Sequence, residues 1–179
     1  MVKKNIFIIG FSGSGKTTVG KEAAILLKWK FVDIDQEIVN QTSKSIEEIF
    51  KLNNGNEYFR ELEKNTLKKV IESEEQIVST GGGIILDKEN LRFMLDNGYV
   101  ICLDASPTTI FKRLTLQSLS SNNEVRPLLN SDKKLETIIK LKNERNSIYK
   151  KADYFIATDS LNPLDIAQKI TDQWIKVSC

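Results

Sequence analysis

A glycine-rich segment after the first apolar run constrains this chain more than any other feature. Residues 10–17 read GFSGSGKT and match the pattern G-x-x-x-x-G-K-[ST], with the apolar run Asn5 to Ile9 before them and a helical pattern after them. Small residues let consecutive backbone N–H groups face phosphate groups, and the following helix adds the positive end of its dipole. An ordinary glycine-rich turn is the alternative, but the flanking strand and helix favour a phosphate-binding loop.

The side chains of this segment predict a nucleoside triphosphate as the ligand. Lys16 is expected to reach the terminal phosphates, and Thr17 to offer its hydroxyl to Mg²⁺. The residues predicted to bind the nucleotide here are Gly13, Ser14, Gly15, Lys16, Thr17 and Thr18.

Short apolar runs alternate with amphipathic stretches along the rest of the chain. This alternation predicts an α/β fold with a parallel sheet. Capping residues before prolines at Ser106-Pro107 and Asn162-Pro163 mark two helix starts. The five predicted strands are Asn5 to Ile9, Phe31 to Ile34, Gln76 to Ser79, Tyr99 to Leu103 and Asp153 to Ala157.

Composition excludes several classes of protein. The 179 residues suffice for one domain with a full core, and the absence of histidine excludes Ser-His-Asp catalysis and histidine-based zinc sites. Two cysteines cannot build a disulfide framework, so we expect a cytoplasmic protein. The net charge of +2 is spread along the chain and indicates no nucleic-acid-binding stripe, and no apolar run is long enough to predict a membrane span.

A pair of acidic residues follows the second predicted strand. A hydrolysing motor or switch protein would normally end a strand with a metal-binding Asp, but the strand at Gln76 to Ser79 ends in Ser79-Thr80. Asp33 and Asp35 are therefore the candidates. If the segment is extended, both side chains project to the same side, at the strand end where ligands bind in open α/β sheets.

Other candidate residues are ambiguous when each is considered alone. Gly81 to Gly83 follow the third predicted strand and indicate either a flexible turn or a place where a ligand approaches the backbone. Arg60 and Glu63 are i and i+3 neighbours in a helical stretch, where a solvated surface pair is the usual outcome. Arg126 and Arg145 would each be interpreted as surface cations.

Taken together, these segments resemble the shikimate kinase family. The resemblance implies a three-layer α/β sandwich with a five-stranded parallel sheet in the order 2-3-1-4-5. It also implies ATP-dependent phosphorylation of the 3-hydroxyl of shikimate, in the pathway to chorismate and the aromatic amino acids. The matching segments are, in order, GFSGSGKT at 10–17, DID at 33–35, FRELE at 59–63, STGGG at 79–83, RPLL at 126–129 and ERNSIY at 144–149.

The resemblance also implies a role for each matching residue. Arg60 and Arg145 would hold the carboxylate of shikimate, with Glu63 orienting Arg60, and Asp35 would accept hydrogen bonds from the substrate hydroxyls and take part in catalysis. Gly82, with Gly81 and Gly83 beside it, would meet the ring hydroxyls through its backbone. Asp33 would hold Mg²⁺ through water beside Thr17. Lys16 and Arg126 would act on the transferring phosphates, and Arg113 would stack on adenine.

Domain organisation follows from the same resemblance. We expect one kinase domain over residues 1–179, with the core sheet and phosphate loop at 1–34, 74–115 and 150–179. A substrate-binding subdomain is expected at about 35–73 and a lid at about 116–130. The expected partners are ATP and shikimate, with no nucleic acid and no membrane, and the expected state is a monomer.

Two positions depart from the family pattern. Leu161 stands where a second basic residue usually closes the adenine pocket, and Phe11 stands where methionine is common. We interpret Phe11 as a packing variation. Two alternatives for function are a related kinase acting on another small acid, such as gluconate, and a nucleotide-binding sensor without turnover.

Overall fold

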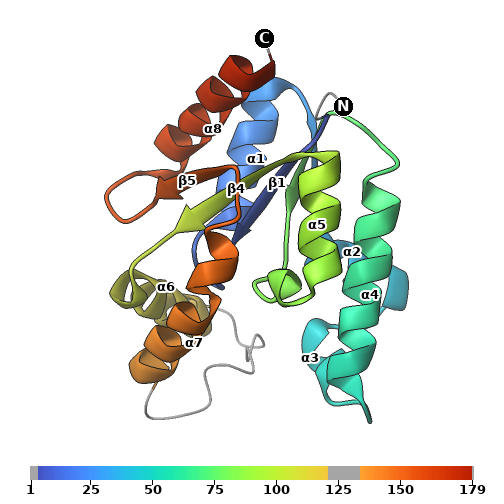
Figure 1. Cartoon of the computed structure of the whole chain (residues 1–179). Helices are drawn as coiled ribbons and strands as arrows, with labels where there is room; N and C mark the ends of the chain where they lie inside the picture. Colours follow the sequence, from blue (N-terminus) through green and yellow to red (C-terminus); the bar gives the residue numbers. More distant parts are fainter. Residues whose placement is uncertain (1–3, 121–133, 179) are drawn as a thin grey trace.

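The protein is built around a five-stranded parallel sheet (Figure 1). A computed structural model describes residues 4–120 and 134–178. The strand order is β2-β3-β1-β4-β5, and every neighbouring pair is parallel, as predicted. The strands differ from the predicted ranges by one residue at most at each end: β1 Ile6–Gly10, β2 Lys30–Asp33, β3 Gln76–Ser79, β4 Tyr99–Asp104 and β5 Tyr154–Ala157.

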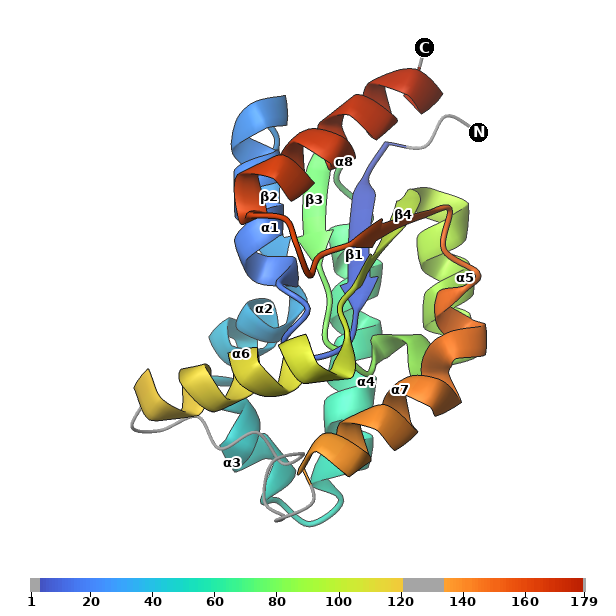
Figure 2. The ribbon, with the colours of Figure 1, turned by 90° about the vertical axis from the view of Figure 1, so that its left-hand side faces the viewer.

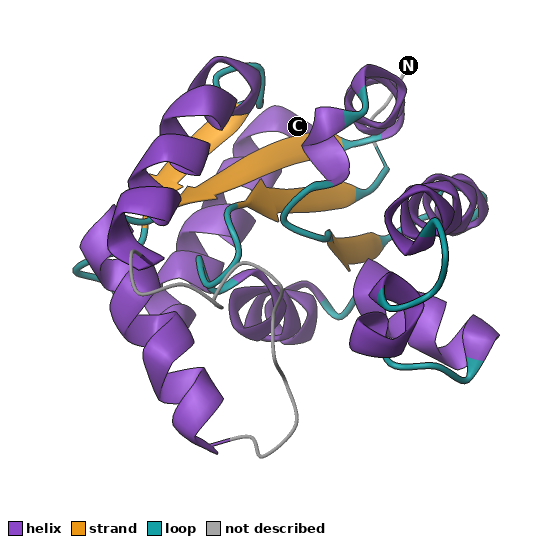
Figure 3. Cartoon of the chain, turned by 90° about the horizontal axis from the view of Figure 1, so that it is seen from below, coloured by secondary structure: helices purple, strands orange, loops and turns teal. Residues whose placement is uncertain are grey.

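Helices cover both faces of the sheet, so the α/β sandwich is confirmed (Figure 3). Alternate residues of β1 point to opposite faces, as the period of an extended chain requires. Ile6 and Ile8 pack with α1 (Lys16–Leu27) and α8 (Pro163–Ser178). Phe7 and Ile9 lie in a second core cluster with residues of α4 (Gly55–Val70) and α5 (Lys88–Asn97). Both clusters are closed to solvent, which fixes the sheet that carries the site.

The segment between β2 and β3 forms three helices rather than one crossover helix. These are α2 (Ile34–Thr42), α3 (Ile46–Phe50) and α4, whose Phe59 ring lies 4.8 Å from that of Phe50. Ser45 begins α3 with a capping box to Glu48. Of these helices, α3 and the start of α4 extend beyond the carboxyl end of the sheet (Figure 1).

The predicted extended geometry of Asp33 to Asp35 is wrong. Asp33 is the last residue of β2, and its side chain accepts hydrogen bonds from the backbone N–H groups of Asp35 at 3.1 Å and Gln36 at 3.4 Å. A carboxylate in this position caps a helix, so α2 begins at Ile34. Asp35 therefore lies in the first turn of α2 instead of in a strand.

Two further helices lie beyond the carboxyl ends of β1 and β4 (Figure 2). α6 (Pro107–Ser120) and α7 (Lys134–Tyr149) pack against each other. The predicted start of α6 is confirmed, since Ser106 Oγ accepts from Thr109 N at 3.2 Å, and Asn162 Oδ1 caps α8 in the same way. The first five residues of the predicted lid belong to α6, while 121–133, including Arg126, lie outside the described residues.

The remaining connection after β3 is a short turn and the 3₁₀ helix η1 (Ile84–Leu86), which leads into α5. The turn consists of the three consecutive glycines. Of the helices that the structure describes, none combines the length and the apolar character that a membrane span requires.

Candidate active site

The glycine-rich segment folds as a phosphate-binding loop around a buried lysine. Gly13 and Gly15 have φ of 81° and 100°, a left-handed region that favours glycine, and α1 begins immediately afterwards at Lys16. Lys16 Nζ donates to the carbonyls of Gly10 at 3.1 Å and Phe11 at 3.0 Å. Lys16 is only 8% exposed, so its charge is held inside the loop rather than in solvent. Such a loop at a helix N-terminus can receive phosphate groups.

Oxygen atoms gather beside the loop at the ends of β2 and β3. Thr17 Oγ1 donates to Asp33 Oδ2 at 2.7 Å and lies 3.4 Å from Ser79 Oγ. Among the described residues no group of three or more Asp, Glu, His or Cys forms a metal site. A hydroxyl and one carboxylate nevertheless fit Mg²⁺, since this ion takes oxygen ligands and binds through one or two protein groups plus substrate phosphates. Thr17 and Asp33 therefore lie together, as the sequence predicted.

Two carboxylates lie against the first glycine of the Gly81–Gly83 turn. A Cβ atom at Gly81 would overlap Glu63 Oε1 and would lie 2.9 Å from Asp35 Oδ1. A side chain at this position would therefore displace one or both carboxylates. Asp35 comes from α2 and Glu63 from α4, so the turn gathers acidic groups from two helices.

Arg60 and Glu63 form an ion pair on α4. The Glu63 side chain is fully buried, whereas that of Arg60 is 35% exposed. Burial raises the pKa of Glu63 to about 7, while Arg60 acts to lower it and the charges of Asp35 and Asp87 act to raise it. Arg60 also lies against the glycine turn, since a Cβ at Gly83 would come within 2.6 Å of Arg60 Nη2.

Arg145 approaches the same turn from α7. Its Nη1 donates to the carbonyl of Gly82 at 3.0 Å, and its guanidinium carbon lies 5.3 Å from the centroid of the Phe11 ring. The Tyr149 hydroxyl, one helical turn further along α7, is buried, and burial raises its pKa. Two arginines separated by 85 positions in the sequence therefore reach one glycine turn, next to the phosphate loop.

Arg113 lies beside the phosphate loop on α6. Its Nη1 donates to the carbonyl of Ser14 at 3.2 Å, and its Nη2 donates to the carbonyl of Thr158 at 3.0 Å. The guanidinium thus joins the loop to the segment that follows β5. Leu161, in that segment, is partly buried against the core cluster of α1 and α8.

The structure brings the described residues predicted for the site together around the phosphate loop and the glycine turn, and it shows two contacts that were not predicted. Phe11 was interpreted from the sequence as a packing variation. In the structure, the guanidinium of Arg145 lies over the Phe11 ring. Thr158, which holds Arg113, was also missed. No periodic pattern distinguishes either residue, although the position of Phe11 inside the loop is a local signal.

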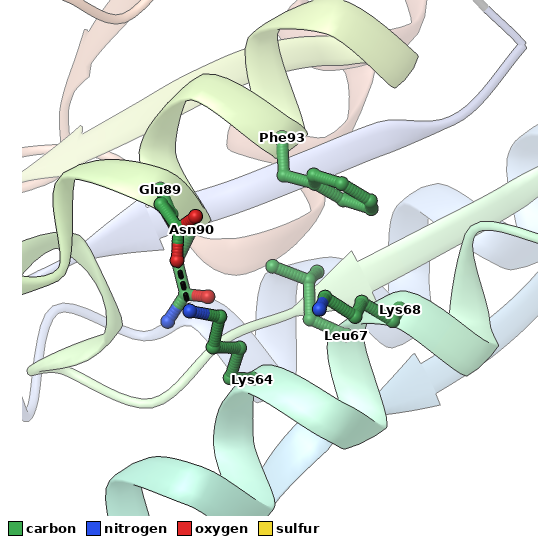
Figure 4. Close-up of a pocket in the computed structure, with 6 residues that line it drawn as sticks. All are labelled: Lys64, Leu67, Lys68, Glu89, Asn90 and Phe93. Carbon is green, nitrogen blue, oxygen red and sulfur yellow. Dashed lines mark hydrogen bonds and ion pairs between the residues drawn. The ribbon is translucent and has the colours of Figure 1, made fainter.

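A separate small pocket lies between α4 and α5 (Figure 4). Its rim carries an ion pair between Lys64 and Glu89, and Leu67 and Phe93 form its apolar part. None of the residues predicted for the site lines this pocket. The glycine turn and the phosphate loop therefore remain the candidate active site.

Comparison with known proteins identifies the family. A sequence model described as shikimate kinase matches residues 12–175. The shikimate kinases of Caldicellulosiruptor saccharolyticus and Persephonella marina are each 42% identical over 93% of this chain and over 93% and 96% of their own lengths. The structure of shikimate kinase from Acinetobacter baumannii in complex with shikimate superposes with a TM-score of 0.88 at 31% identity, covering 97% of this chain and 94% of that one. Since sequence and fold agree over nearly the whole length, the chain belongs to the shikimate kinase family.

Proposed function

We propose that this protein transfers the γ-phosphoryl group of ATP to the 3-hydroxyl of shikimate, giving shikimate 3-phosphate and ADP. The pathway served is the one to chorismate and the aromatic amino acids. Relatives named shikimate kinase support the proposal, as does the related structure that contains shikimate. The observation that carries it is the approach of Arg60 and Arg145 to one glycine turn beside a phosphate loop.

Shikimate binds at this turn in the proposed complex. Its carboxylate lies between the guanidinium groups of Arg60 and Arg145, because arginine presents two parallel donors to a carboxylate. The hydroxyls face Asp35 and the backbone of Gly81 to Gly83, because glycine has no side chain of its own to keep a ligand from the backbone. Glu63 holds Arg60 from its buried side.

ATP binds with its phosphates in the loop. The backbone of residues 13–18 and the buried ammonium of Lys16 face the phosphates, and Arg113 lies next to the loop on the adenine side. Arg126 is proposed to add a second cation from the lid, at about 116–130. Leu161 packs against the core and offers no cation to the base, so Arg113 is the proposed contact to adenine.

Thr17 would hold Mg²⁺ through its hydroxyl, and Asp33 would hold it through water. When bound, the ion neutralises charge on the phosphate oxygens during transfer. Asp33 also accepts a hydrogen bond from Thr17, so the same carboxylate orients the hydroxyl that faces the loop.

Asp35 is the proposed acceptor of the proton from the 3-hydroxyl. As the hydroxyl oxygen bonds to the γ-phosphorus, the bond from that phosphorus to the β–γ bridging oxygen breaks, and ADP leaves. The loose transition state of phosphoryl transfer depends mainly on alignment and charge neutralisation. Lys16 and Arg126 supply charge, and the two arginines of the glycine turn align the acceptor.

We also propose that the single kinase domain works as a monomer in the cytoplasm, with residues 35–73 forming the substrate-binding subdomain. The three helices between β2 and β3, which carry Asp35, Arg60 and Glu63, support the subdomain. The cysteine content supports a reducing compartment: Cys102 is buried, and burial raises its pKa to about 12.

The test is a coupled assay of ADP release with shikimate, with gluconate and with no acceptor, each with and without Mg²⁺. We expect ADP release only with shikimate and Mg²⁺ together. Release with gluconate alone would assign the chain to another small acid. Nucleotide binding without release under any condition would favour a sensor.

A further inference from the structure

Phe11 lies where the phosphate loop meets the acceptor-binding arginine. It is the second residue of the loop and only 2% exposed, yet the guanidinium carbon of Arg145 lies 5.3 Å from its ring centroid. We propose that Phe11 is a positioning residue for the acceptor: its ring holds Arg145 where the carboxylate of the substrate binds. The proposal rests on the proposed function, because it assumes that Arg145 binds that carboxylate.

The surroundings of Phe11 make its ring a fixed surface. It packs in a core cluster with Ile110 and Leu114 of α6 and Ile138 of α7. Its backbone carbonyl is fixed as well, since it accepts from Lys16 Nζ at 3.0 Å and from Ser14 N at 3.1 Å. A ring held by two helices and by its own loop has little freedom to follow Arg145, so the ring sets the position of the guanidinium.

The partners of Arg145 explain why a ring is suited to this position. Arg60 is held by the carboxylate of Glu63, which partly neutralises it. Among the described residues, no ion pair joins Arg145 to a carboxylate; it donates to the Gly82 carbonyl, lies over Phe11 and interacts with the buried Tyr149 hydroxyl. A carbonyl dipole and an aromatic face attract a cation without supplying a formal negative charge. Arg145 is thereby oriented while its charge stays available to an incoming anion.

Fluorination of the ring tests this idea with little change in shape. Successive fluorine atoms withdraw charge from the aromatic face and weaken its attraction for a cation. We would introduce 4-fluoro-, 3,5-difluoro- and 3,4,5-trifluorophenylalanine at position 11 and measure KM for shikimate, KM for ATP and kcat. The KM for shikimate should rise with each added fluorine atom and should be about 3- to 30-fold higher in the trifluoro variant than in the parent. The KM for ATP should stay within about two-fold of the parent value.

The matched control is the same series at Phe7, a fully buried ring in β1 for which the described residues provide no cation contact. Fluorination there should leave KM for shikimate unchanged. Phe11→Leu, which removes the ring, should raise that KM at least as much as trifluorination. A KM for shikimate independent of fluorine number, or a KM for ATP that rises in step with it, would overturn the proposal. Failure of the unmodified protein to phosphorylate shikimate would instead overturn the proposed function.

Discussion

Glu63 is fully buried in its ion pair with Arg60, while the arginine remains about one third exposed. This difference in exposure matters because the Glu63 carboxylate fixes the Arg60 guanidinium from the protein side and leaves its other side open to a ligand. A buried carboxylate with one cationic partner is costly to ionise, and its raised pKa reflects this. The pair is therefore poorly explained as a surface salt bridge, the usual outcome for i and i+3 neighbours.

Replacing Arg145 with alanine should weaken acceptor binding and leave nucleotide binding nearly unchanged. The carboxylate of shikimate would lose one of its two guanidinium partners. The fall in kcat/KM for shikimate should therefore correspond to a loss of about 2–5 kcal/mol in transition-state stabilisation. Steady-state kinetics with each substrate varied in turn gives the comparison. Arg92→Ala is the control. The Arg92 side chain is 85% exposed on α5, so its removal should leave the kinetics unchanged. Unchanged kinetics in Arg145→Ala would remove this residue from the site.

Replacing Asp35 with asparagine should reduce turnover far more than stability. The amide keeps the size of the side chain but neither carries the charge nor accepts the proton of the hydroxyl. Asp165→Asn is a matched control, since Asp165 also lies in the first turn of a helix, α8, and is exposed. Each variant should lose about 0.3–1 kcal/mol of helix-dipole stabilisation. If the melting temperature of Asp35→Asn falls in step with its activity, Asp35 has a structural role.

Local patterns in the sequence predict the phosphate loop, the five strands of a parallel sheet and the helix starts at Pro107 and Pro163, whereas the strand order follows only from the family resemblance. They succeed because each signal depends on neighbouring residues: glycines before Lys16, apolar runs, and capping residues before prolines. The extended geometry of Asp33 to Asp35 failed because the capping hydrogen bonds of Asp33 favour a helix there. An apolar Ile34 alone does not distinguish the two conformations.

The contacts within the site depend on residues far apart in the chain, and the sequence predicts these only through resemblance to a family. Nothing local to Arg145 indicates that it meets the Gly82 carbonyl and the Phe11 ring. Those contacts follow from the docking of α7, which an ion pair between Lys142 and Asp104 at 2.7 Å helps to fix. The position of Phe11 inside the phosphate loop is a local signal, but its contact with Arg145 follows only once α7 is placed.

Replacing Gly81 with alanine should impair the acceptor site and spare the nucleotide site. The added methyl would overlap Glu63 and crowd Asp35, so these side chains or the turn must move, at a cost of about 1–3 kcal/mol in stability. The KM for shikimate should rise, whereas ADP affinity measured by calorimetry should be close to that of the parent. An unchanged KM for shikimate in a folded Gly81→Ala protein would mean that these carboxylates do not contribute to acceptor binding.

The buried carboxyl of Glu63 should make stability depend on pH in a particular direction. Because its pKa rises from 4.5 to about 7 on folding, the folded protein retains a proton that the unfolded chain releases between these values. The contribution of Glu63 to the free energy of unfolding should therefore be highest below pH 4.5. This contribution should fall by about 3 kcal/mol as pH rises to 7. Glu63→Gln cannot titrate, so urea unfolding of both proteins across this range isolates the effect. A stability difference between them that does not change with pH would show that Glu63 stays ionised when folded, with Arg60 outweighing burial.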